Sequence, residues 1–172
     1  MANRNQGFTL IELIVTLSIL TIVVSIAFPV FTEMVARSRQ QALLNDVWST
    51  VQNARVTAVL HRETIEICGS KDTVNCTSDW SDGWLVHSPG RQQARNLTQL
   101  PSSDQLRWRG LGKNIRFRSN GTTLNNGTFY QCHKQKLAWQ LKLSRQGRLR
   151  IATPAENNKE QAICDTEQAH GN

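Results

Sequence analysis

The side chains with the clearest binding chemistry are pairs of arginines that flank one apolar or aromatic residue. Side chains alternate between the two faces of a β-strand, so Arg148 and Arg150 point the same way, with Cα atoms ~7 Å apart. The same spacing recurs at Arg116 with Arg118 and at Arg107 with Arg109. Guanidinium groups bind phosphate oxygens in a bidentate manner. Three such pairs on one surface predict binding to the phosphates of a nucleic acid, without recognition of the bases.

The surrounding charge supports this interpretation. Residues 91–150 contain nine arginines and four lysines but a single acid, Asp104, in a chain whose net charge is +7. Such a region attracts polyanions, and its cations have no obvious ion-pair partners in the sequence nearby. Further cations placed to assist are Lys134, Lys136, Lys142 and Arg145. The alternative is that each arginine pair is simply the solvated face of a half-buried strand.

Catalytic and metal chemistry find no support in the sequence. The four cysteines show no C-x-x-C pair, and the four histidines show no metal-ligand spacing. No residues form a recognisable catalytic group, so we predict neither an enzyme nor a cofactor.

In an oxidising compartment the cysteines are expected to form two disulfides. Three pairings are possible, and we favour Cys68 with Cys76 and Cys132 with Cys164. The second bridge would hold the C-terminal tail beside a strand over residues 148–152. Reduction should then loosen the cationic surface.

The N-terminal region predicts a membrane helix. Residues 8–31 are almost entirely apolar, with Glu12 as the one ionisable side chain, and a helix of this length crosses the ~30 Å hydrocarbon layer. Only a short polar stretch precedes the segment and no A-x-A cleavage site follows it, so the segment should be retained. A carboxylate within such a helix costs ~2.5–3.5 kcal/mol and usually marks a function. Glu12 therefore needs a partner that neutralises it.

Hydrophobic periodicity predicts the elements that must position these residues. A helix is expected over residues 8–60, bent or loosened at Pro29, and its second half carries an apolar stripe that can pack on a sheet. The stripe consists of Leu43, Leu44, Val47, Trp48, Val51, Ala54 and Ala58. Alternating runs predict antiparallel strands over residues 64–68, 83–87, 114–118, 128–132, 137–143 and 148–152. Residues 91–103 predict a mobile loop, and the tail after residue 151 should be poorly ordered unless Cys164 holds it.

Residues 7–13, Gly-Phe-Thr-Leu-Ile-Glu-Leu, closely resemble the signature of type IV prepilins. The resemblance implies cleavage after Gly7 by a prepilin peptidase and methylation of the new amine on Phe8. It also implies that Glu12 pairs with the N-terminal amine of a neighbouring subunit during filament assembly.

The rest of the chain resembles the FimT/GspH group of minor pilins and pseudopilins, in the order of one long helix followed by strands and in the sequences of residues 115–121 and 141–150. The implied fold is α+β and pilin-like, with the helix packed on an antiparallel β-sheet domain. Residues 147–150, Gly-Arg-Leu-Arg, match the G-R-x-R element of DNA-binding FimT pilins that act in natural transformation. The resemblance implies that Arg148 and Arg150 contact phosphate and that Gly147 permits the close turn.

These features predict a leader over residues 1–7, a transmembrane helix half over 8–31, an amphipathic helix half over 32–60 and a β-rich globular domain over 61–172. The first hypothesis is a minor type IV pilin that binds DNA and supports DNA uptake. It is expected in the inner membrane, with its globular domain in the periplasm, and then in a cell-surface pilus. Expected partners are DNA, other pilin subunits, prepilin peptidase and the inner membrane. The alternative is a structural minor pilin or type II secretion pseudopilin that primes filament assembly.

Overall fold

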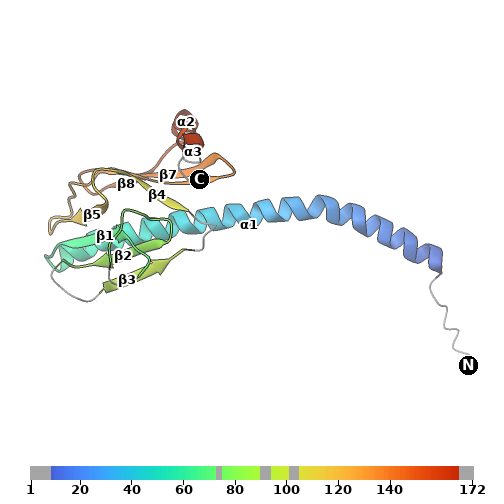
Figure 1. The fold of residues 1–172 in the computed structure, drawn as a ribbon, viewed down its shortest axis with the longest axis horizontal. Helices are drawn as coiled ribbons and strands as arrows, with labels where there is room; N and C mark the ends of the chain where they lie inside the picture. Colours follow the sequence, from blue (N-terminus) through green and yellow to red (C-terminus); the bar gives the residue numbers. More distant parts are fainter. Residues whose placement is uncertain (1–8, 73–74, 90–93, 101–104, 167–172) are drawn as a thin grey trace, which may run out of the picture. The chain divides into compact units, whose positions relative to one another are not determined.

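The computed structural model describes residues 9–72, 75–89, 94–100 and 105–166. The predicted leader and the predicted processing residues, Gly7 and Phe8, lie outside these ranges. The chain forms two compact units, Met1–Arg39 and Gln40–Asn172. The long helix α1, Leu10–Leu60, contributes its first part to one unit and its second part to the other (Figure 1).

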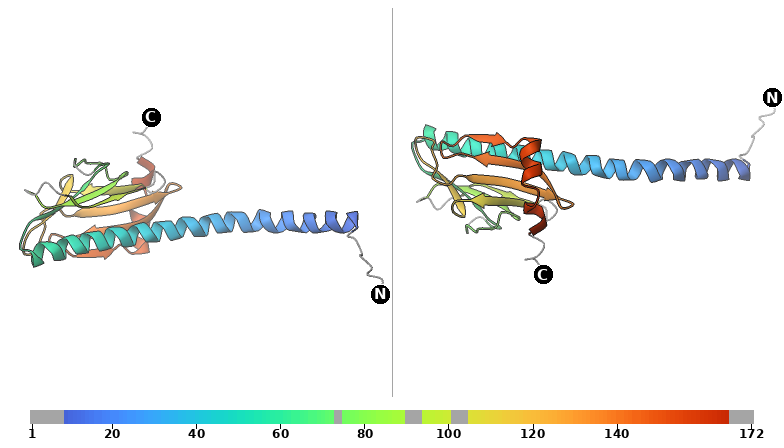
Figure 2. Two further views of the ribbon diagram at one scale, coloured as in Figure 1. Left: turned by 90° about the horizontal axis from the view of Figure 1, so that it is seen from below. Right: turned by 90° about the horizontal axis from the view of Figure 1, so that it is seen from above.

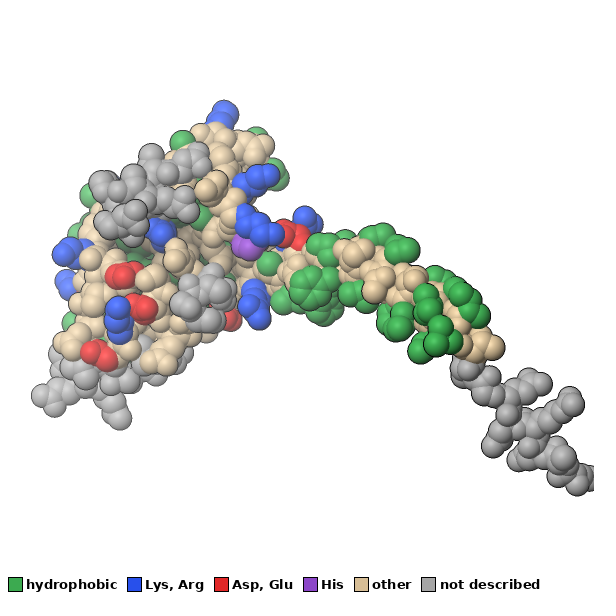
Figure 3. All heavy atoms as spheres, turned by 45° about the vertical axis from the view of Figure 1, so that its right-hand side comes forward, with side chains coloured by type: hydrophobic (Ala, Val, Ile, Leu, Met, Phe, Trp, Pro, Cys, Tyr) green, Lys and Arg blue, Asp and Glu red, His purple; other side chains and the backbone are tan. Residues whose placement is uncertain are grey.

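In the first unit, α1 has the composition of a membrane-spanning helix. It is long and apolar enough to cross a bilayer, stays helical on both sides of Pro29 and exposes its apolar side chains, drawn in green in Figure 3. The hydroxyl groups of Thr16, Ser18, Thr21 and Ser25 donate to backbone carbonyls three or four residues earlier. These polar groups are therefore satisfied within the helix, as a hydrocarbon environment requires.

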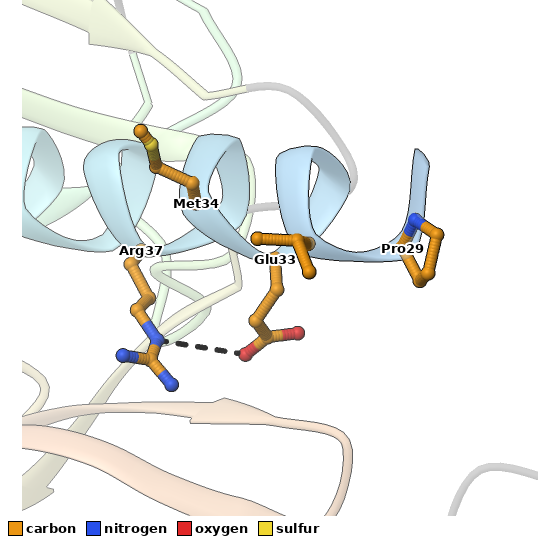
Figure 4. Close-up of a pocket in the computed structure, with 5 residues that line it drawn as sticks. Pro29, Glu33, Met34 and Arg37 are labelled. Atoms are coloured by element: carbon orange, nitrogen blue, oxygen red, sulfur yellow. Dashed lines mark ion pairs between the residues drawn. The ribbon is translucent and has the colours of Figure 1, made fainter. Parts of the chain in front are cut away.

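The same unit has a shallow hollow after Pro29, where Arg37 Nε lies 3.8 Å from Glu33 Oε1 (Figure 4). Val30 and Met34 complete its lining. Exposed pairs of this kind contribute little to stability. Because all five residues lie on neighbouring turns of α1, the hollow is a groove of the helix surface and not an enclosed site.

In the second unit, the rest of α1 packs one face against β-strands. Its buried side chains are Leu43, Leu44, Val47, Val51, Ala54 and Ala58. This confirms the predicted stripe, whose remaining member, Trp48, is partly buried and packs against the same core. The stripe joins strand residues such as Ile67, Phe117 and Phe129 in the main hydrophobic core, and removal of this apolar surface from water stabilises the unit by ~25 cal/mol per Å².

Within the described residues, eight strands form two antiparallel sheets (Figure 1). The first has the order β3-β2-β1-β5, with β1 at Ile65–Gly69, β2 at Gly83–His87, β3 at Ala94–Gln99 and β5 at Asn114–Phe117. The second has the order β4-β6-β7-β8, with β4 at Leu106–Gly110, β6 at Gly127–His133, β7 at Lys136–Leu143 and β8 at Leu149–Ile151. The predicted α+β fold, a long N-terminal helix packed on an antiparallel β-domain, is confirmed, but its division into two sheets was not predicted.

Two strands lie where the sequence analysis predicts none. β3 falls within residues 91–103, so the prediction of a mobile loop is wrong for residues 94–99. Its sequence has no apolar alternation, and it lies at the edge of its sheet, paired with β2. β4 does alternate: Leu106 is buried and Trp108 packs against the core, while Arg107 and Arg109 point to the other face.

The C-terminal tail is held by Cys164, as the sequence analysis expects, and it forms two short helices. α2, Pro154–Lys159, and α3, Ile163–Thr166, contact β7 and cross the strands as the red segment in Figure 2. α2 begins with a capping box, in which Thr153 Oγ1 accepts from the Glu156 amide and the Glu156 carboxylate accepts from the Thr153 amide. Both favoured disulfides are present, Cys68–Cys76 and Cys132–Cys164. The second fastens α3 to β6.

Candidate functional site

The hairpin between β7 and β8 carries the G-R-x-R residues, and its turn requires glycine. Gly147 has a φ of +73°, in the region that residues with a Cβ atom rarely adopt. Its amide donates to the Ser144 carbonyl at 2.9 Å, and the Arg148 amide donates to Ser144 Oγ at 3.2 Å. A Cβ atom at residue 147 would also collide with the Gly121 carbonyl oxygen. Gly147 therefore sets the path by which Arg148 leaves the turn.

Strand pairing brings three of the predicted cations to one face of this hairpin. Lys142 lies directly opposite Arg150, and Arg148 points to the same side as Arg150 because the two are two residues apart. All three line an open groove of about 390 Å³. Its lining is completed by Leu143, Ser144, Gln146 and Leu149. The groove therefore offers cationic donors to an extended anion.

A second turn lies beside the first. The Thr123 amide donates to the Arg145 carbonyl at 2.9 Å, and Arg55 of α1 donates through Nε to the Gly121 carbonyl at 3.1 Å. Arg118 begins this second turn, since its carbonyl accepts from the Gly121 amide. In the described part of the chain no ion pair involves Arg118, Arg145 or Arg148. The two turns thus hold three predicted cations that no carboxylate pairs with among the described residues.

The cations on the adjoining sheet face do have acidic partners, contrary to the sequence analysis. Glu156 of α2 accepts from both terminal nitrogens of Arg150, at 2.7 and 2.8 Å. Lys142 Nζ lies 3.2 Å from Glu156 and 3.1 Å from Glu160, and Glu160 also pairs with Arg109 at 2.5 Å. A local count of charges misses these acids, because they follow the basic region in the sequence and fold back over β7.

Glu156 and Glu160 are the residues that sequence reasoning missed, although a signal for one of them was present. Residues 153–156, Thr-Pro-Ala-Glu, form a capping-box pattern with proline at the first helical position. That pattern predicts a helix start in a part of the tail where the sequence analysis predicted no helix.

Both carboxylates are stabilised in their charged form. Hydrogen bonds from Arg150, from the Thr153 amide and from Lys142 hold the pKa of Glu156 far below its ordinary value. Burial acts to raise the pKa of Glu160, but Lys142 and Arg109 together outweigh burial and lower it. At neutral pH the tail therefore places two negative charges on the cationic face.

Arg116 does not belong to this surface. It lies on β5 of the other sheet, opposite Glu66 of β1, and donates to the Glu66 carboxylate at 2.7 and 3.0 Å. Glu66 is only 5% exposed and needs this counter-ion. The prediction that three arginine pairs line one surface is therefore wrong for Arg116, whereas Arg118 lies in the turn beside the groove.

Lys134 and Lys136 lie at the far end of β7. They flank the turn between β6 and β7, where Lys134 and Gln135 have φ of +48° and +63°. β7 runs from Lys136 to Leu143, so this turn is ~23 Å from the groove at ~3.3 Å per residue. Their position does not support the predicted role as auxiliaries to Arg148.

One group of described residues has the donor atoms for a metal ion. Ligand atoms of Cys68, Cys76 and His87 lie within 4.8 Å of one another. The two sulfurs are joined in a disulfide, however, and metal ions bind the thiolate. The group is therefore no metal site while the disulfide is intact.

Comparison with known proteins identifies the family. Residues 44–147, more than half of the chain, match the model of the type II transport protein GspH. The chain belongs to the GspH family. Residues 2–28 match the prokaryotic N-terminal methylation motif. This GspH-family protein is a type IV minor pilin or pseudopilin, a class of structural proteins whose members associate with other pilin subunits.

Individual relatives agree with this assignment. The chain is 26% identical over 148 residues to the type IV major fimbrial protein FimA of Dichelobacter nodosus, covering 81% of this chain and 84% of that protein. A crystal structure of the type IV minor pilin FimU of Pseudomonas aeruginosa matches with a TM-score of 0.55 and 21% identity, over 69% of this chain and 92% of FimU. A second crystal form gives a TM-score of 0.55 and 22% identity, over 67% and 94%. At this identity the FimU structures show the shared fold.

Proposed function

We propose that this GspH-family pilin binds DNA without sequence preference and supports DNA uptake in natural transformation. The observation that carries the proposal is the groove beside Gly147, in which Arg148 has no acidic partner among the described residues and lies on the same side as Lys142 and Arg150. Guanidinium groups pair with phosphate oxygens. Contacts to the phosphate backbone position DNA but carry no sequence information.

The neighbouring turn adds further cations to the proposed DNA-binding surface. Arg118 and Arg145 belong to two turns that are joined by a backbone hydrogen bond, and both side chains are exposed. Duplex DNA carries about one charge per 1.7 Å of its axis. Cations spread over two turns can therefore engage one DNA molecule together.

The N-terminal motif supplies the cellular setting of the proposal. We infer that prepilin peptidase cleaves after Gly7, that Phe8 carries the methylated amine and that Glu12 pairs with this amine on a neighbouring subunit. The match to the methylation motif over residues 2–28 supports this inference. Before assembly the pilin would reside in the inner membrane with its globular domain in the periplasm. It would then enter a cell-surface pilus.

The test is a salt series of duplex DNA binding by the full-length protein in detergent. Arg148→Gln/Arg150→Gln should lose most of the affinity, and its slope of log affinity against log salt should shrink by about two. Lys134→Gln/Lys136→Gln, with the same loss of charge at the far end of β7, is the matched control and should keep most of the affinity. Circular dichroism checks that both variants are folded.

Equal, weak binding by wild type and both variants would contradict the proposal. The role of a structural minor pilin or pseudopilin that primes filament assembly would then be favoured. In that case Arg148→Gln/Arg150→Gln should reduce piliation, whereas a DNA-binding role predicts loss of DNA uptake with normal piliation.

A further inference from the structure

The outer face of the second sheet carries a cationic row that crosses all four strands. Arg109 of β4 lies opposite Thr128 of β6, Thr128 lies opposite Lys142 of β7, and Lys142 lies opposite Arg150 of β8. Residues directly opposite on paired strands share one face of a sheet. Three cations therefore stand in one line, and this line adjoins the groove at Arg148.

Two carboxylates of the tail occupy the cationic row. Glu156, within α2, bonds Arg150 and Lys142, and Glu160, which follows α2, bonds Lys142 and Arg109. Carboxylate and phosphate oxygens accept the same charge-assisted hydrogen bonds. A polyanion can reach the whole row only if these two acids withdraw from it.

The contacts that hold α2 in place are accessible to water and salt. None of its side chains is buried, and the arginine side chains that pair with Glu156 and Glu160 are more than half exposed. The Lys142 side chain, which pairs with both acids, is 23% exposed. Ion pairs between exposed side chains contribute little and are screened by salt. Gln140 lies on β7 two residues before Lys142 and therefore on the same face. Its side chain is fully buried, yet neither atom of its amide group has a hydrogen-bond partner among the described residues. An unsatisfied buried amide lowers the stability of this docked arrangement.

The tail is nevertheless fastened on both sides of α2. Before it, the Ala152 amide donates to the Gln140 carbonyl at 3.0 Å, which extends the β7–β8 pairing. After it, Gln161 Nε2 donates to the Gln135 carbonyl at 2.9 Å, and Cys164 is bonded to Cys132. Tyr130, Leu137 and Ile163 pack around this disulfide in a small second core. Residues 153–160 can therefore lift as a loop while the tail stays attached.

We propose that α2, with Glu156 and Glu160, is an acidic cover that imitates DNA phosphates and is displaced when DNA binds. This proposal rests on the proposed function, because it concerns the regulation of the same surface. The uncovered Arg148 makes the first contact with DNA. Phosphates then replace the two carboxylates, and Arg109, Lys142 and Arg150 become part of the DNA-binding surface.

The test compares binding of a 30-base-pair duplex by the full-length wild type and by Glu156→Gln/Glu160→Gln. Glutamine preserves the capping box of α2, so the helix should still form. The matched control is Asp46→Asn/Asp82→Asn. It removes the same number of negative charges, but from α1 and from the segment just before β2. Removal of the competing acids should tighten binding about tenfold, while the control should change it less than about threefold.

A second readout follows the cover itself. Hydrogen exchange of the wild-type amides over residues 155–160 should become faster when DNA is added, while the amides around Cys132 should stay protected. Exchange that slows on DNA binding would overturn the proposal. So would equal affinity of the glutamine variant and the control while the wild type binds DNA, and the proposed function would then stand. If none of the three proteins binds DNA, both the cover and the proposed function fail.

Discussion

Arg148 and Arg150 lie two residues apart on one face of a hairpin, yet their electrostatic surroundings differ. Arg150 is held by both oxygens of Glu156 at 2.7 and 2.8 Å, whereas Arg148 has no ion pair among the described residues. A phosphate must displace Glu156 to reach Arg150 but meets Arg148 directly. The two arginines of the G-R-x-R element are therefore not equivalent, although the sequence motif alone does not distinguish them.

Arg116 is predicted to matter for stability and not for DNA binding. Arg116→Gln should lower the free energy of unfolding by ~1–3 kcal/mol, because it leaves the buried Glu66 carboxylate without its counter-ion. The loss should fall below that of a fully buried pair, since the Arg116 side chain is 55% exposed. Asn114 also bonds Glu66 and keeps part of the stabilisation. Urea denaturation measures the change, and DNA affinity should stay within about twofold of wild type.

The double variant Glu66→Gln/Arg116→Gln is the control for this prediction. It removes both charges and should recover part of the stability lost in Arg116→Gln. A single variant as stable as the wild type, or one that loses most of its DNA affinity, would show that Arg116 acts differently from what the structure indicates.

Helices and strands whose apolar residues recur at regular spacing could be predicted from the sequence. A strand without such spacing could not. The buried stripe of α1 and six of the strands follow from apolar spacing. β3 could not be predicted, because Ala-Arg-Asn-Leu-Thr-Gln has no alternation and forms a strand only through its pairing with β2. α2 could have been predicted from its capping box.

The candidate site was only partly predictable for a related reason. Alternation predicts Arg148 and Arg150 on one face, and both line the groove. The turn at Gly147 was implied by the resemblance to FimT pilins and is present in the structure. The pairing of Arg109 with Glu160 joins residues 51 positions apart, and that of Arg116 with Glu66 joins residues 50 apart. Local charge counts cannot reveal such pairs, because the tertiary fold alone brings them together.

The docking of α2 should depend on pH. The pKa of Glu156 is lower in the docked helix than its ordinary value of 4.5, so ionised Glu156 favours docking. This contribution is fully present above pH ~4.5 and is lost as the pH falls below it towards the folded-state pKa. The NMR signal of the Thr153 amide, which donates to Glu156, should therefore shift below pH 4.5. The same signal in Glu156→Gln is the control and should show little pH dependence; equal shifts in both proteins would contradict the prediction.

At the scale of the whole molecule, the division of the chain predicts that the second unit folds alone. The main core takes its α1 residues from Leu43 onward, and the compact units divide between Arg39 and Gln40. Residues 40–172, produced under oxidising conditions without detergent, should unfold in one transition. The midpoint in urea should match that of the globular part of the full-length chain. A clearly lower midpoint, or loss of the cooperative transition, would mean that the first unit supports the core.

The fastening of the tail on both sides of α2 also bears on how quickly a bound polymer is released. A displaced carboxylate that cannot diffuse away stays near the cations at an effective concentration in the millimolar range, as linked groups generally do. Whenever one phosphate contact opens by thermal motion, Glu156 or Glu160 is at hand to replace it. The two carboxylates would thus replace the DNA phosphates one contact at a time. The protein's own acidic groups would therefore accelerate the dissociation of DNA from this face. A filament subunit that must pass DNA onward would then need no separate factor to let it go.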